Sequence, residues 1–91
     1  MKEKPVCTKI TIPSITEYVA VARLAISGIA GRVGFNIEEI EDIKIAISEA
    51  CTNAIQHAYT DDDQKIDITI NAYKEKIEIT VQDYGKGFDP K

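Results

Sequence analysis

The chain has 91 residues, enough for one small domain with a single hydrophobic core. Hydrophobic residues make up 44% and charged residues 29%, which is typical of a globular protein and too apolar for a disordered one. The net charge of −4 argues against nucleic-acid binding, because that binding depends on cationic contacts with phosphates. No uncharged apolar stretch approaches the roughly 20 residues of a membrane span, and no signal-peptide core is present. We therefore expect a cytoplasmic protein.

The cysteine and histidine content makes a disulfide framework or a zinc site a poor explanation. Cys7 and Cys51 are far apart in the sequence, without CxxC spacing, and we expect two buried, reduced thiols. His57 is the single histidine and has no cysteine or histidine nearby.

The first predicted elements are a strand and a helix. Residues 6–12 alternate like a half-buried strand that ends at Pro13, with Val6, Thr8, Ile10 and Ile12 on one side. Ser14 has Glu17 three residues later, the spacing of a capping box, so a helix is expected to begin there. Its apolar positions are Val19, Ala22, Ile26 and Ile29, and we expect the glycines at 28, 31 and 34 to weaken and break it.

A second helix is predicted from Asn36, which again has a glutamate, Glu39, three residues later, to about Tyr59. One stripe of this helix is apolar and should face the core: Ile40, Ile43, Ile47, Cys51, Ala54 and Ala58. Residues 60–64 form a polar acidic turn, and alternating segments at 66–73 and 77–82 then predict a β-hairpin. This order of elements predicts an α+β fold, a two-layer sandwich with the helices on one face of a mostly antiparallel sheet.

The second helix carries a polar line that the fold does not require. Glu49, Asn53 and His57 follow each other at steps of four residues, nearly opposite the core stripe. Spacing alone favours an ordinary solvated face. Ala46 and Ala50 lie on the same side and make the strip low, so a ligand could approach closely. An amide oxygen can ligate Mg²⁺, and a carboxylate one turn away can act as a base.

A second feature follows the last predicted strand. The alternation places Asp83 on the core-facing side, where a carboxylate needs a hydrogen-bond partner. Gly85 and Gly87 come directly after it and would allow a close approach of the backbone to a ligand. An aspartate that caps its own turn explains the same residues about as well as a ligand contact does.

These two features together resemble a known superfamily. The segment from Glu49 to Ala54, with residues 57–59, resembles the N box of the ATPase superfamily of gyrase, Hsp90, histidine kinases and MutL. Residues 83–87 resemble its G1 box. Within the superfamily, residues 41–59 are very similar to the anti-sigma serine kinases of bacterial partner switching, above all those of the anti-sigma-B type.

The resemblance implies a role for each matching residue. Asn53 would ligate the Mg²⁺ that bridges the phosphates of ATP, and Glu49 would be the general base. Asp83 would accept a hydrogen bond from the adenine amine, flanked by Gly85 and Gly87. Arg23 aligns with a sigma-factor contact, although an exposed helix charge explains it equally well. His57 receives no role.

The resemblance also implies a function. We expect an anti-sigma factor that sequesters a sigma factor and uses Mg-ATP to phosphorylate a serine of an anti-anti-sigma protein, as a homodimer, without direct contacts to nucleic acid or membrane. A non-catalytic, nucleotide-dependent binding module is the main alternative. An ATPase of the gyrase type is a weaker one, because its partner domains do not fit in 91 residues.

The resemblance has one gap. The family continues into a lid and a second glycine-rich box that supply phosphate contacts, and residues 1–91 contain neither. We therefore expect a single domain that corresponds to the N-terminal portion of the family's ATPase domain, and phosphoryl transfer by these residues alone should be poor.

Overall fold

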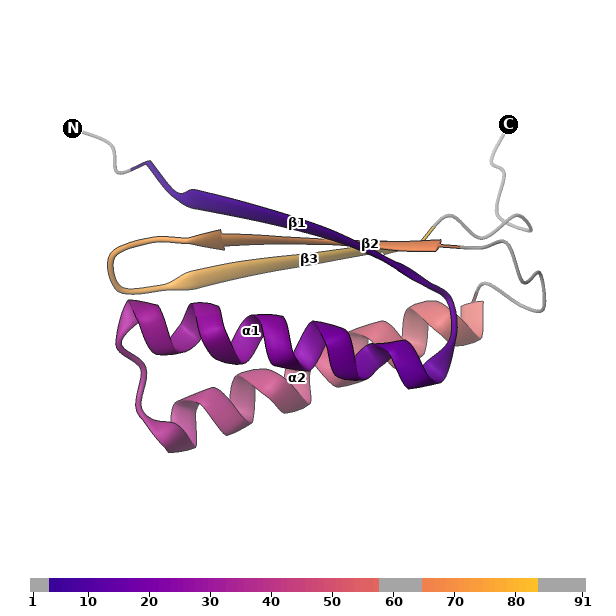
Figure 1. Cartoon of the computed structure of the whole chain (residues 1–91), viewed down its shortest axis with the longest axis horizontal. Coiled ribbons are helices and arrows are strands. Elements are labelled where there is room, and N and C mark those ends of the chain that lie inside the picture. The colour runs from indigo at the N-terminus through magenta and orange to yellow at the C-terminus, as the bar shows by residue number, and fades with distance from the viewer. Residues whose placement is uncertain (1–3, 58–64, 84–91) are drawn as a thin grey trace.

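The computed structural model describes residues 4–57 and 65–83. The elements in these ranges are β1 (Val6–Pro13), the 3₁₀ helix η1 (Thr16–Tyr18), α1 (Val19–Val33), α2 (Ile37–His57), β2 (Lys65–Ala72) and β3 (Ile77–Asp83). The strands form an antiparallel sheet in the order β1-β2-β3, and both helices cover the same face of it (Figure 1). The predicted α+β two-layer sandwich is confirmed.

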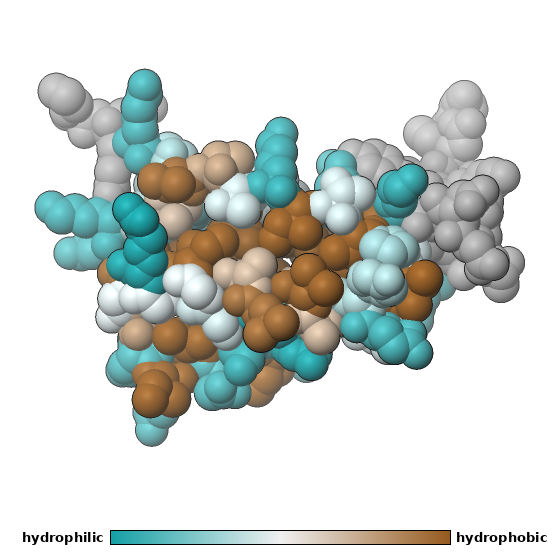
Figure 2. Space-filling view, viewed as in Figure 1, coloured by the Kyte–Doolittle hydropathy of each residue, from teal (hydrophilic) through white to brown (hydrophobic). Residues whose placement is uncertain are grey.

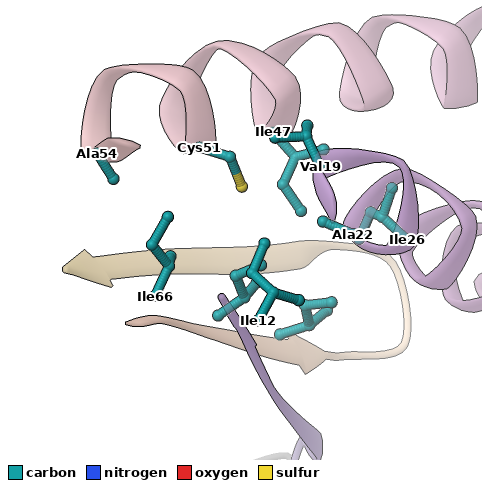
Figure 3. Packing of buried hydrophobic residues seen from close by; sticks show 10 residues of the cluster. Ile12, Val19, Ala22, Ile26, Ile47, Cys51, Ala54 and Ile66 are labelled. Carbon is teal, nitrogen blue, oxygen red and sulfur yellow. The ribbon is translucent and has the colours of Figure 1, made fainter. Parts of the chain in front are cut away.

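The core lies between the helices and the central strand. β2 supplies the inward-facing Ile66, Ile68 and Ile70, which are fully buried, as the alternation predicts. The helices contribute Val19, Ala22, Ile26, Ile47, Cys51 and Ala54. Figure 3 shows Cys51 and Ala54 pointing from α2 toward the strands. On β1 the exposed fraction falls from 62% at Val6 to 2% at Ile12, because only the later part of the strand joins this core.

The start of α2 follows the predicted capping box. The backbone N–H of Glu39 donates to Oδ1 of Asn36 at 2.8 Å, and the N–H of Asn36 donates to Oε1 of Glu39 at 2.9 Å. Two donors that the helix cannot pair internally are thereby satisfied. α2 reaches His57, while its predicted last turn and the turn at 60–64 lie outside the described residues.

The predicted start of the first helix is wrong. Ser14 does not cap a helix: the N–H of Ile15 donates to the carbonyl of Pro13 at 2.7 Å, and the N–H of Tyr18 donates to that of Ile15 at 2.9 Å. These bonds close a tight turn and η1, so α1 begins only at Val19. Proline cannot donate and fixes its own φ, which favours such a turn at the end of β1.

The predicted break of the first helix is correct at one glycine only. α1 continues through Gly28 and Gly31 and ends at Val33, followed by Gly34, whose φ of 109° is left-handed. A helical glycine costs about 1 kcal/mol, which is less than the burial of the neighbouring apolar face contributes. At Gly34 the amide donates to the carbonyl of Ala30 at 3.1 Å and closes the last turn.

Candidate functional site

The C-terminal half of α2 carries a shallow polar hollow. Its volume is about 300 Å³ and it is lined by Ser48, Glu49, Thr52 and Asn53. Glu49 and Asn53, predicted from their spacing, therefore open onto the same hollow, and both residues are exposed.

The orientation of the hollow follows from the buried side of α2. Ile47 and Cys51 are 1% and 0% exposed, so they fix which side of the helix faces the sheet. At 100° per residue, Glu49 and Asn53 point about 200° and 240° away from Ile47, toward solvent. Packing of the apolar stripe thus presents the acid and the amide outward.

The flanks of the hollow differ from the prediction. We expected Ala46 and Ala50 beside the polar pair, but the residues that line it are Ser48 and Thr52. On the same helical wheel these two lie about 100° and 140° from Ile47, next to Glu49. Helical spacing alone therefore places Ser48 and Thr52 between the core stripe and the polar line and is sufficient to predict them.

The donor set of the hollow suits a hard cation held jointly with phosphate oxygens. All four side chains offer oxygen atoms, and oxygen ligands are those that Mg²⁺ prefers. Among residues 4–57 and 65–83, no group of three or more His, Cys, Asp or Glu side chains could hold a metal by itself. Mg²⁺ usually keeps waters and takes one or two protein ligands together with the substrate phosphates, so the side chains present fit it.

The predicted purine contact is only partly described. The backbone of Asp83 ends β3 opposite Ile66, in phase with the partly buried Ile77, Ile79 and Val81. Figure 1 shows this end of β3 and the C-terminal end of α2 at the same end of the molecule, away from the β2–β3 hairpin. The side chains of Asp83 and His57 lie outside the described part, as do Gly85 and Gly87. The contact of Asp83 with adenine therefore stays a prediction.

Arg23 links the two helices at the edge of the hollow. It is exposed on α1, and its Nη1 donates to Oγ of Ser48 at 3.4 Å. Its sequence neighbours Val21 and Leu24 are 43% and 75% exposed, on other sides of α1. Figure 2 shows apolar side chains among hydrophilic ones across this view of the molecule.

Cys7 and Cys51 form no disulfide, and neither lines the hollow. Both are free thiols, as predicted, and Cys51 is buried. The prediction that both are buried is wrong for Cys7, which is exposed because it alternates with the inward side of β1. Burial raises the pKa of the Cys51 thiol, because the thiolate loses its hydration there.

Within the described residues, no helix has the length and apolar character that crossing a membrane requires.

The sequence matches a protein family and curated proteins from Bacillus species. Residues 12–91 match the model of the histidine kinase-like ATPase domain. The chain is 53% identical over 78 residues to serine-protein kinase RsbW from Bacillus cereus (strain ATCC 10987 / NRS 248), and equally to that of Bacillus thuringiensis subsp. konkukian (strain 97-27). Each alignment covers 86% of this chain and 49% of the relative, so the chain spans about half the length of the curated relatives it matches. The exposed acid and amide on α2 fall within the matched residues. The chain therefore belongs to the histidine kinase-like ATPase domain family.

Proposed function

We propose that the chain is the nucleotide-binding part of an anti-sigma factor that phosphorylates a serine of its anti-anti-sigma partner with Mg-ATP. The observation that carries this proposal is the shared hollow of Glu49 and Asn53 on α2. The 53% identity to proteins named serine-protein kinase supports the reaction class.

The chemistry assigns one task to each side chain. The serine hydroxyl oxygen attacks the γ-phosphorus of ATP while the carboxylate of Glu49 takes the hydroxyl proton. The bond from the γ-phosphorus to the oxygen that bridges it to the β-phosphate breaks, and ADP leaves. The amide oxygen of Asn53 would hold Mg²⁺, which supplies charge neutralisation at the phosphates. In this proposal Asp83 accepts a hydrogen bond from the adenine amine, and Gly85 and Gly87 lie beside the base.

The proposed partner surface is α1. Arg23 is exposed there, and Val21 and Leu24 add exposed apolar area on another side of the same helix. Protein interfaces are enriched in arginine and combine it with apolar contacts. We propose that this surface binds the sigma factor, in the cytoplasm, with the protein acting as a homodimer.

The test replaces Glu49 by Gln in the full-length protein. Glu49 is exposed and its side chain makes no hydrogen bond or ion pair with residues 4–57 or 65–83, so stability should change by less than about 0.5 kcal/mol. Transfer to the anti-anti-sigma protein should fall by about 10²- to 10⁴-fold, while ATP affinity stays nearly constant. Glu38→Gln is the control, because Glu38 is also exposed on α2 but lies outside the hollow. Normal transfer by the Glu49→Gln protein would refute the base assignment.

The alternative is a binding module that responds to nucleotide without catalysing transfer. The exposed Val21 and Leu24 favour partner binding whether or not transfer occurs. If the Glu49→Gln protein released its sigma factor in response to ATP and the partner as efficiently as the parent protein, this alternative would replace the kinase proposal.

A further inference from the structure

A second hollow lies at the opposite end of the molecule, beside the β2–β3 hairpin. Its volume is about 450 Å³, within the range of small-molecule sites. It is formed where the start of β1, the last turns of α1 and the end of β2 come together, and Figure 1 shows these segments side by side. None of its lining residues lies in the Glu49–Asn53 hollow.

The lining of this hollow combines positive charge with apolar surface. Lys4, Arg32 and Lys74 come from three separate segments, and the described lining contains no carboxylate. Three of the eleven cationic side chains thus converge in a chain whose net charge is −4. The C-terminal end of α1 contributes only about half a negative charge, so the described lining carries a net positive charge.

Apolar side chains form the wall between these charges. Val6, Ile29 and Val33 line the hollow, and Val6 is 62% exposed. Figure 2 shows apolar side chains framed by hydrophilic ones at this end of the molecule. A pocket of mostly apolar lining with a few converging polar groups is the usual composition of a site for small organic ligands.

We propose that this hollow binds a small organic anion, with its carboxylate or phosphate group near Arg32 and Lys4 and its apolar body against Val6 and Val33. Within residues 4–57 and 65–83, the Arg32 side chain makes no hydrogen bond or ion pair, so its guanidinium has donors to offer. A guanidinium can bind either anionic group through two parallel hydrogen bonds.

Nuclear magnetic resonance titration of the full-length protein tests the site with defined probes. Phenyl phosphate and benzoate carry an anionic group on an apolar ring, benzyl alcohol carries the ring alone, and inorganic phosphate carries the charge alone. We expect at least one of the two ring anions to saturate, with amide shifts centred on Val33 and Ala72. The neutral ring and inorganic phosphate should each bind at least fivefold more weakly. The better ring anion identifies the anionic group that the hollow prefers.

Substitutions separate the hollow from general surface charge. Arg32→Gln should weaken binding of the better ring anion at least fivefold. Arg32→Lys should weaken it less, because the positive charge remains. Lys9→Gln removes the same charge from the same sheet outside the hollow and should change affinity less than twofold. Equal losses from Arg32→Gln and Lys9→Gln, equal binding of benzyl alcohol, or no saturation by either ring anion would overturn the proposal.

This inference is independent of the proposed nucleotide site. Asn53→Ala should weaken ATP binding and leave the affinity for the ring anion unchanged, since Asn53 lines the other hollow and not this one. Loss of ring-anion binding in the Asn53→Ala protein would show that the probe binds at the nucleotide site and would also overturn the proposal.

Discussion

Two isoleucines on α2 provide a direct test of how the proposed catalytic face is oriented. Ile47 is 1% exposed and Ile45, two residues earlier, is 56% exposed. Replacing Ile47 with Ala removes three buried carbon groups at about 0.8 kcal/mol each and leaves a cavity, so we expect a loss of about 2–5 kcal/mol. A chain of this size has a total stability of only about 5–14 kcal/mol at the usual value per residue. Ile47→Ala should therefore remove a large share of it.

Ile45→Ala is the matched control on the same helix. Less than half of this side chain is buried, and alanine has the higher helix propensity, so we expect a loss of no more than about 1 kcal/mol. Urea denaturation followed by circular dichroism measures both changes, provided that the m-value is unchanged. Equal losses would mean that α2 is rotated from the described position. Because Glu49 and Asn53 are placed by the same helical phase, such a result would also remove the geometric basis of the nucleotide site.

The other predictions concern the capping box, two glycines of the first helix and the cysteines. Asn36→Ala should destabilise the protein by about 1 kcal/mol, because the capping box at α2 is lost. Thermal unfolding measures this, and Glu39→Gln should cost less because glutamine can also complete the box. Gly34→Ala should cost about 1–2 kcal/mol at its left-handed φ. By contrast, Gly31→Ala should stabilise the protein by about 0.5–1 kcal/mol, since a Cβ there meets nothing within 4 Å; a loss at Gly31 would contradict this account. Iodoacetamide should label Cys7 in the folded protein and Cys51 only on unfolding. Burial raises the pKa of Cys51 in the folded state. The stability that its neutral thiol contributes is therefore complete below the pKa of the unfolded chain, roughly 8.5, and is lost as pH rises through the pKa of the folded state. The stability difference between the parent and Cys51→Ala should change in that direction, and a difference independent of pH would refute the assignment.

The amino-acid pattern alone was sufficient for the layers and for most of the core. Alternation in β2 predicted the buried Ile66, Ile68 and Ile70, and the helical period of α2 predicted Ile47 and Cys51. The reason is that these periods are local properties of the backbone, so each buried face can be identified without knowledge of its partner. The same period placed Glu49 and Asn53 on the outer face.

Features that depend on contacts between distant segments required the tertiary structure. The start of α1 at Val19 and its continuation through Gly31 were mispredicted, because a turn after Pro13 and burial of the helix outweigh local preference. The hollow near Arg32 joins segments around residues 4, 32 and 74, and no spacing in the sequence predicts that meeting. Local periodicity determines which side of each element is apolar, whereas only packing of the elements decides which polar groups on different elements come to share one space.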